Sequence, residues 1–264
     1  MLKLVNVCKT FNTGTINERK ALIDINLELN EGDFITVIGG NGAGKSTVLN
    51  AVAGIWPVDS GAIFIDGNNV TGMPEHVRAK FIGRVFQDPM MGTAPDMQIE
   101  ENLALALRRG KRRGLGWGVT AKEKVEFKQK LSRLGLGLED RMTSKVGLLS
   151  GGQRQALTLL MASIQRPKLL LLDEHTAALD PATAALVLEI TEQIVSENNL
   201  TTLMVTHNMG DAIKYGNRLI MMNEGRIIYE VSGEEKKSLT KDDLMKKFAA
   251  VSGTQLDSDE MLLG

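Results

Sequence analysis

The strongest structural signal in this chain is the segment Gly39-Gly40-Asn41-Gly42-Ala43-Gly44-Lys45-Ser46. Its spacing fits the phosphate-binding loop pattern G-x-x-x-x-G-K-[ST]. Glycines let backbone N–H groups turn inward and approach phosphate oxygens, because no Cβ stands in the way. The apolar, β-branched run 34–38 precedes the loop and reads as a buried strand, and a helical pattern follows it. A strand, a glycine-rich loop and a helix in this order predict a nucleotide-binding α/β domain.

The polar residues at the end of the loop have separate expected roles. The Lys45 ammonium can reach the β- and γ-phosphates, and the Ser46 hydroxyl can ligate Mg²⁺. Thr47 offers another donor to phosphate, and the helix that begins near Lys45 adds its positive N-terminus. The sequence therefore predicts ATP and Mg²⁺ as ligands, with further nucleotide contacts from Gly39, Asn41, Gly42, Ala43 and Gly44.

Two acids follow a second buried strand. Leu169 to Leu172 form an unbroken leucine run, and Asp173 and Glu174 come directly after it. In a P-loop protein an acid at a strand end can hold Mg²⁺, directly or through its water, and we assign this role to Asp173. Glu174 lies past the strand end, where it can polarise an attacking water as a general base. Acids at a loop are usually only solvated, and the upstream glycine loop makes the catalytic interpretation the better one.

The alternation of strand and helix patterns predicts an α/β fold. Strand patterns cover 2–7, 23–29, 34–38, 62–65, 82–86, 168–173, 201–206, 218–222 and 226–230, and Asp66-Gly67 reads as a hairpin turn. Helical patterns cover 45–53, 99–109, 120–134, 151–165, 181–196 and 208–215. We expect a P-loop NTPase core with a mostly parallel sheet, an N-terminal antiparallel β subdomain and an inserted helical subdomain.

One domain is expected to span all 264 residues. Its core is predicted at about 1–88 and 166–252, its helical insertion at about 89–165, and a polar, frayed tail at 253–264.

Bulk composition narrows the function. The net charge of −1 argues against whole-protein attraction to nucleic acid, and the single cysteine cannot form an internal disulfide. No apolar run approaches the roughly 20 residues of a membrane span, and no signal-peptide pattern opens the chain. We therefore expect a cytoplasmic protein whose contact with a membrane comes through a partner.

Further motifs identify a resemblance. Leu149-Ser150-Gly151-Gly152-Gln153 matches the signature of ABC ATPases, and Gln87 ends a strand where that family has its Q-loop. Ala178-Leu179-Asp180 resembles the D-loop, and His207 resembles the switch histidine. Phe11 stands where the family places an aromatic ring that stacks on adenine. The chain resembles an ABC transporter ATP-binding subunit of the bacterial import type over its whole length.

The resemblance implies that two subunits close head-to-tail around two ATP molecules. The partner's site would then be completed by Ser150, Gly151, Gly152 and Gln153. The physical reason is that Ser150 and glycine amides at a helix N-terminus form a second anion nest. Asp180 would also lie at the nucleotide. The same residues also read as a serine N-cap followed by glycines, and both interpretations hold together.

The resemblance also assigns catalytic partners. Gln87 would touch Mg²⁺ or the lytic water, and His207 would bridge the γ-phosphate and Glu174. His175 stands where the family usually has proline, so a place beside the site stays open for it, and His76 is expected at the surface. Phe11 replaces the common tyrosine and keeps the stacking face.

Partners follow from the same resemblance: separate permease subunits, an extracytoplasmic substrate-binding protein, and a peripheral position on the cytoplasmic side of the membrane. The rivals are an ATPase acting on nucleic acid or ribosomes and an ATPase of cofactor assembly; the single cassette disfavours the first, and no nucleic-acid partner is expected. The acid segment 173–180 and the segment 83–89 resemble import systems for amino acids. The basic run Arg108-Arg109-Gly110-Lys111-Arg112-Arg113 reads as a solvated loop, a membrane or permease contact, or a nucleic-acid patch.

Overall fold

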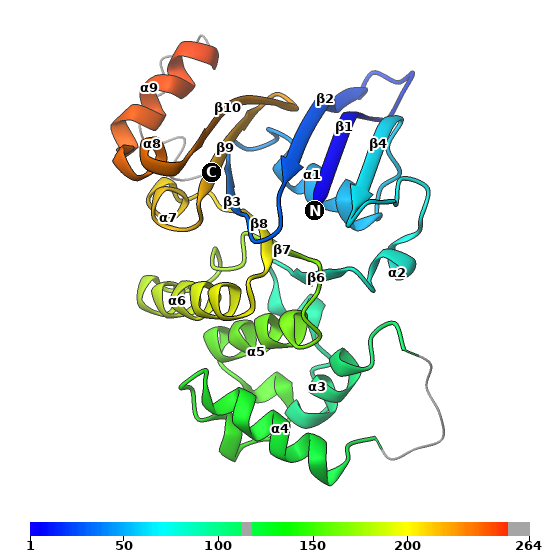
Figure 1. Ribbon diagram of the computed structural model, residues 1–264, viewed down its shortest axis with the longest axis vertical. Coiled ribbons are helices and arrows are strands. Elements are labelled where there is room, and N and C mark those ends of the chain that lie inside the picture. The colour runs from blue at the N-terminus through cyan, green and yellow to red at the C-terminus, as the bar shows by residue number, and fades with distance from the viewer. Residues whose placement is uncertain (112–117, 253–264) are drawn as a thin grey trace.

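A six-stranded sheet lies at the centre of the fold, in the strand order β10-β9-β3-β8-β7-β6 (Figure 1). Strands β9, β3, β8, β7 and β6 run parallel, and β10 pairs antiparallel with β9. The strands are β3 (Phe34–Ile38), β6 (Ile82–Val85), β7 (Leu169–Asp173), β8 (Thr201–Val205), β9 (Arg218–Asn223) and β10 (Arg226–Ser232). The computed structural model describes residues 1–111 and 118–252. The predicted tail, and Arg112 and Arg113 of the basic run, lie outside the described residues.

A second, antiparallel sheet is formed by the N-terminal part of the chain. Its order is β2-β1-β4-β5, with β1 (Leu2–Phe11), β2 (Arg19–Leu29), β4 (Ser60–Ile65) and β5 (Asn68–Asn69). The predicted hairpin is confirmed, because Ile65 pairs with Asn68 across Asp66 and Gly67, which both have positive φ. Strand β1 is longer than its pattern predicted, and its added C-terminal half ends at Phe11.

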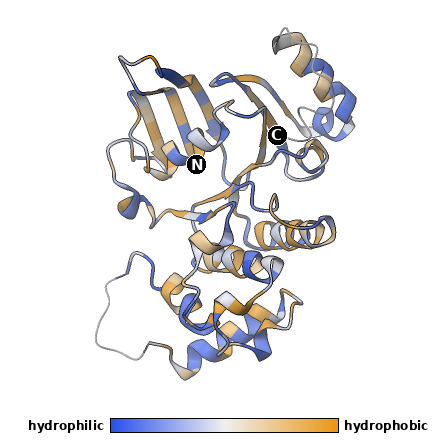
Figure 2. Ribbon diagram, turned by 180° about the vertical axis from the view of Figure 1, so that it is seen from behind, coloured by the Kyte–Doolittle hydropathy of each residue, from blue (hydrophilic) through white to orange (hydrophobic). Residues whose placement is uncertain are grey.

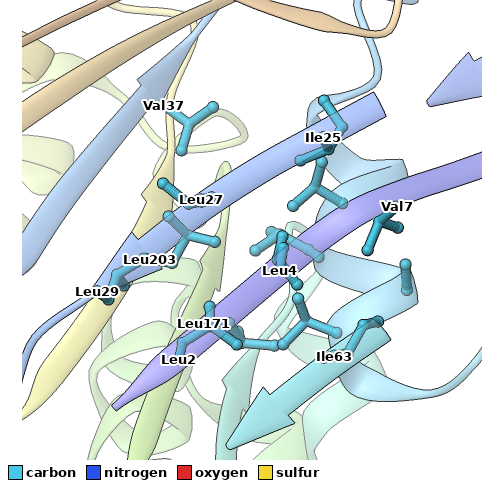
Figure 3. Packing of buried hydrophobic residues seen from close by; sticks show 14 of the residues in the cluster. Leu2, Leu4, Val7, Ile25, Leu27, Leu29, Val37, Ile63, Leu171 and Leu203 are labelled. Carbon is cyan, nitrogen blue, oxygen red and sulfur yellow. The ribbon is translucent and has the colours of Figure 1, made fainter. Parts of the chain in front are cut away.

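Helix α1 (Lys45–Ala53) packs between the two sheets. Its buried residues share one hydrophobic cluster with side chains of both sheets. Figure 3 shows part of this cluster, with Leu4 of β1, Ile25 of β2 and Leu171 of β7 among its residues. Because the P-loop precedes α1, burial of α1 fixes the loop against the ends of β3 and β7.

The segment 89–165 contains helices and turns in its described residues. Its elements are η1 (Pro89–Gly92), α3 (Ile99–Leu107), α4 (Ala121–Ser132), η2 (Leu138–Asp140), η3 (Val146–Leu148) and α5 (Gly151–Ser163). Helices α3 and α4 lie at the end of the molecule opposite the antiparallel sheet (Figure 1). A second cluster joins them through α5 to β7 and to α6 (Pro181–Asn198). The numerical division of the chain into core and insertion stays a prediction.

The remaining short helices are α2 (Glu75–Arg78), α7 (Met209–Lys214), α8 (Gly233–Ser238) and α9 (Lys241–Ser252). The sequence did not predict α8 and α9, whose turns are rich in lysine and acid. Helix α9 packs through Leu244 and Phe248, which are buried with residues of α7, β9 and β10 in a third cluster. Figure 2 shows hydrophilic and hydrophobic residues mixed along α9. Within the described ranges, no helix is both long and apolar enough to cross a bilayer.

Candidate nucleotide-binding and hydrolysis site

The P-loop connects β3 to α1, as its motif predicts. Gly39, Gly42 and Gly44 all have φ between 75° and 151°. A Cβ at Gly39 would come within 2.2 Å of the Met222 carbonyl oxygen, so only glycine fits there without a backbone shift. Ala43 is buried and donates its backbone N–H to the Gly40 carbonyl, while Asn41 is exposed. The loop is thus held in shape by its own backbone and by the neighbouring strands.

The Lys45 side chain folds back onto the first residues of the P-loop. Its Nζ donates to the carbonyls of Gly39 at 2.8 Å and Gly40 at 3.2 Å, and it lies 3.8 Å from Oε1 of Glu174. The side chain is only 7% exposed. Burial lowers the pKa of Lys45, and the nearby charges of Glu174 and Asp173 oppose this shift. The ammonium is therefore held at the loop by the carbonyls of Gly39 and Gly40.

Ser46 and Asp173 meet across the boundary between α1 and β7. The Ser46 hydroxyl donates to Oδ1 of Asp173 at 3.1 Å. Mg²⁺ binds oxygen ligands, and in nucleotide sites it takes one or two protein oxygens together with phosphates and water. A hydroxyl and a carboxylate at this separation, beside the phosphate loop, fit this requirement.

Glu174 stands immediately after β7 in an unusual backbone conformation. Its φ is 43°, and its backbone N–H donates to the Val205 carbonyl of β8 at 3.1 Å. A non-glycine residue in the left-handed region is strained, and such strain persists where the surrounding structure dictates it, often at functional sites. The side chain is about one-fifth exposed, at 21%, and faces Lys45. The acid is thus held within reach of the P-loop.

Arg84 belongs to this site, although the sequence reasoning missed it. It lies on β6, and its Nη2 donates to Oδ1 of Asn50 at 2.7 Å and to Oδ2 of Asp173 at 3.4 Å. The available signal was a charged residue inside the apolar strand pattern Ile82 to Phe86. Charged residues are rarely buried without a partner.

Near the connection between β1 and β2, the paired residues Phe11 and Arg19 have different contacts. Phe11 ends β1 and makes an edge-to-face contact with Trp56, with ring centroids 4.8 Å apart. Arg19 opposes Phe11 across the strands and donates to the Gly42 carbonyl. The sequence did not indicate Arg19, because its contact depends on how the second sheet sits over the loop.

The signature segment begins α5. Ser150 is its N-cap: Oγ accepts from the Gln153 N–H at 3.3 Å, and Oε1 of Gln153 accepts from the Ser150 N–H at 3.2 Å. Ser150 and Gly151 are exposed, whereas Gly152 is buried against α6, where a Cβ would lie 2.2 Å from Cγ2 of Thr183. Among the described residues, no hydrogen bond or ion pair joins residues 150–153 to residues 39–47.

The other predicted residues lie at strand ends or helix starts. Gln87 is exposed two residues after β6, and Thr47 is half-buried in the first turn of α1. Asp180 caps α6, where its Oδ1 accepts from the Thr183 N–H at 3.1 Å; hydrogen bonding to the Thr183 side chain, and then to its backbone, lowers the Asp180 pKa. His207 follows β8 and lines a hollow between α6 and α7, without a hydrogen bond to Glu174 in the described structure.

The two remaining histidines have different environments. His175 is only 2% exposed, and its Nε2 lies 3.1 Å from Oγ1 of Thr191 on α6. The Thr191 hydroxyl donates to the Val187 carbonyl, so the histidine Nε2 carries the proton in their contact. Burial lowers the pKa of His175 to about 4. The side chain is thus a neutral group packed against α6, while His76 is exposed as predicted.

The described part of the basic run is tied into the helices. Nη2 of Arg108 donates to both carboxylate oxygens of Glu123 on α4, at 2.8 and 3.1 Å. Arg109 donates to the Ala162 carbonyl of α5 at 3.3 Å, and its Nε is buried. Burial lowers the pKa of the Arg109 guanidinium. These two cations therefore do not fit the interpretation as a solvated loop.

A parallel sheet with a P-loop, an acid pair at the end of β7 and a glycine-containing start to α5 define an ATP-hydrolysing cassette. A protein-family model described as "ABC transporter" matches residues 22–177, more than half of the chain. The chain belongs to the ABC transporter family, as an ATP-binding, ATP-hydrolysing subunit of the import type.

Individual relatives agree with this placement. A tyrosine transport ATP-binding protein of Clostridioides difficile is 43% identical over 248 residues, which cover 94% of this chain and 98% of the relative. The phosphonates import ATP-binding protein PhnC of Lactococcus lactis subsp. cremoris is 32% identical and covered over 99% of its length, with 94% of this chain covered.

Solved structures give the same architecture. A dimeric post-hydrolysis state of the ATP-binding cassette MJ0796, bound to ADP and Pi, has a TM-score of 0.75 and 30% identity, covering 88% of this chain and 98% of that one. A nucleotide-free cassette from an ABC transporter has a TM-score of 0.74 and 26% identity, covering 100% and 99%.

Proposed function

We propose that this chain powers solute import by closing with a second copy of itself around two ATP molecules. The observation that carries the proposal is the division of the anion-binding groups. One complete phosphate cradle surrounds Lys45, while the exposed Ser150 segment at the start of α5 makes no hydrogen bond to that cradle. Dimeric cassettes among the solved relatives support the closed pair.

Each nucleotide site would have a P-loop half from one chain and a signature half, beginning at Ser150, from the other. The residues of the P-loop half would perform the chemistry. Lys45 binds the β- and γ-phosphates, Phe11 stacks on adenine, and the Thr47 hydroxyl donates to a phosphate oxygen. Glu174 accepts a proton from the attacking water, because its carboxylate follows β7 beside Lys45. His207 and Gln87 orient this water from neighbouring strand ends.

Mg²⁺ would be held by Ser46 and Asp173, with Gln87 as a third protein contact. The ion supplies charge neutralisation between the phosphates during hydrolysis. The donation from Ser46 to Asp173 keeps both oxygens at this position.

The signature half would act on the partner's nucleotide. Ser150, Gly151 and Gly152 present a hydroxyl and free N–H groups at the positive end of α5. Gln153 fixes Ser150 through the capping box, and Asp180 starts α6 beside this segment. This arrangement assigns each nucleotide to two chains.

The partners we propose are separate permease subunits and an extracytoplasmic substrate-binding protein, which place the chain at the cytoplasmic side of the membrane. The printed name of the C. difficile relative, a tyrosine transport protein, supports an amino acid as the solute. Copurification with a membrane protein tests this partnership. A copurifying ribosomal or cofactor-assembly protein would favour one of the soluble alternatives instead.

Complementation in mixed dimers tests the two-chain site. We combine Ser150→Arg chains with Lys45→Ala chains, so that one composite site carries both defects and the other carries neither. We expect the mixture to hydrolyse ATP faster than the sum of the separate variants. A Ser150→Arg chain that fails to bind ATP as a monomer would contradict the proposal, since the signature would then serve its own chain.

A further inference from the structure

Sheet register brings Arg84 to the acid end of β7. In the parallel pair β6–β7, Arg84 stands opposite Leu171. Side chains two residues apart on a strand share a face, so Leu171 and Asp173 lie on the same side of the sheet as Arg84. This side packs against α1, which supplies Asn50.

The two oxygens of Asp173 have different partners. Oδ1 accepts from the Ser46 hydroxyl at 3.1 Å, and Oδ2 faces Nη2 of Arg84 at 3.4 Å. Asn50 accepts from the same Nη2 at 2.7 Å. A chain of contacts therefore runs from Asn50 through Arg84 to Asp173 and Ser46.

Packing alone does not account for an arginine at this position. The Arg84 side chain is only 11% exposed, and its Nε and Nη1 are buried without a hydrogen-bond partner among the described residues. Burying a cation with unsatisfied N–H groups is costly, and an apolar side chain of similar volume would fill the space at lower cost. Three neighbours compensate this cost: Oδ1 of Asn50, the Asp173 carboxylate, and the Phe86 ring, whose centroid lies 4.6 Å from the guanidinium carbon.

We propose that Arg84 is a positioning residue for Asp173: by holding Oδ2, it keeps Oδ1 directed toward Ser46 and the Mg²⁺ position. The inference rests on the proposed function, because it assigns a task within that nucleotide site. An unrestrained carboxylate turns readily about its last side-chain bond. Groups that orient a metal ligand typically change metal affinity 10- to 100-fold when they are removed, by analogy with second-shell partners in metal sites.

The test measures nucleotide binding with and without the metal. Arg84→Met removes the cation at similar volume, and Arg109→Met is the matched control, because it removes another buried arginine that has no contact with Asp173. In EDTA, titration with a fluorescent ATP analogue should give affinities that agree within about threefold among the wild type, Arg84→Met and Arg109→Met. We then compare the factor by which Mg²⁺ raises the affinity for the ATP analogue. This factor should be about tenfold smaller for Arg84→Met than for the wild type and for Arg109→Met.

Two further variants separate positioning from folding. Arg84→Lys keeps the charge without the planar fork, so its metal effect should be intermediate. Asn50→Ala removes the acceptor that holds Nη2, so it should also reduce the gain in nucleotide affinity that Mg²⁺ gives. In the Arg84→Met background, Asn50→Ala should cause no further reduction, because Nη2 is already absent. If Arg84→Met fails to unfold cooperatively by circular dichroism, Arg84→Lys and Asn50→Ala carry the same comparison.

A folded Arg84→Met chain with the wild-type response to Mg²⁺ overturns the inference. So does an Asn50→Ala effect that stays the same size in the Arg84→Met background. Neither result contradicts the proposed nucleotide site. That proposal is contradicted by a different result, namely that Lys45→Ala binds ATP as well as the wild type.

Discussion

Two helices of this chain begin at glycine-containing loops, and their surroundings differ. At α1, the P-loop holds three glycines with positive φ, the Lys45 cation, and two acids from the end of β7. At α5, the capping box of Ser150 and Gln153 satisfies its own backbone, and Arg154 donates to the carbonyls of Gly147 and Leu149. The first start therefore brings charges of both signs to its loop, whereas the second start uses its polar side chains on its own backbone.

The difference shows that an N-terminal helix dipole is only part of a catalytic site. Both helix starts offer N–H groups to an anion. Under the proposed function, the P-loop also has a cation for the phosphates, oxygens for a metal and an acid for water. The signature segment would then complete a site without forming one by itself. Four predictions test this contrast.

The largest effect is expected at the acid of the P-loop half. Glu174→Gln keeps the shape and removes the base, so the rate of phosphate release should fall by ~10²- to 10⁴-fold. ATP binding should remain, and an ATP-bound dimer should accumulate in size-exclusion chromatography with light scattering. A rate within threefold of wild type would show that the chemistry does not depend on this acid.

Binding to the monomer should separate the two helix starts. Lys45→Ala deletes a charged donor to phosphate, so affinity for a fluorescent ATP analogue should drop by about 10- to 100-fold. Ser150→Arg should leave this affinity within about threefold, although it blocks hydrolysis by filling the glycine nest. Equal losses for the two variants would mean that both helix starts serve the nucleotide of their own chain.

The tight contact between α5 and α6 should appear in stability. A Cβ at Gly152 would lie 2.2 Å from Cγ2 of Thr183, so Gly152→Ala should lower the free energy of unfolding by up to about 3 kcal/mol. Urea unfolding measures this loss. Thr183→Ser removes the contacting methyl group, so the double variant should recover most of the stability; if it does not, the close contact is not the cause.

The smallest effect is expected in the pH dependence of stability, through the buried side chain of His175. His175 follows Glu174 and bonds to α6, and its pKa of about 4 lies below the ordinary 6.5. Below pH 6.5 the unfolded chain therefore binds a proton that the folded protein does not. Stability should be fully present above this pH and fall by about 2 kcal/mol between pH 7 and pH 5.

Urea unfolding at these two pH values measures the fall. His175→Gln should lessen it, and the exposed His76→Gln serves as the control. An unchanged pH slope in His175→Gln would contradict a neutral buried imidazole.

The sequence by itself determined the P-loop, the acid pair, the signature helix and the α/β class. Each depends on residues that are close along the chain, since a glycine, a cap or a strand pattern acts within a few positions. The helices of 233–252 were not predicted, because packing against β9 and β10 stabilises them more than their own residues do.

Tertiary structure alone decided which distant side chains meet. Arg84 contacts a carboxylate 89 residues away, and Arg19 reaches a carbonyl 23 residues away on another element. The burial of His175 against α6 was equally invisible in the motif that precedes it. These contacts depend on sheet register and on how layers stack, and a single strand pattern gives the face of a residue but not its neighbour.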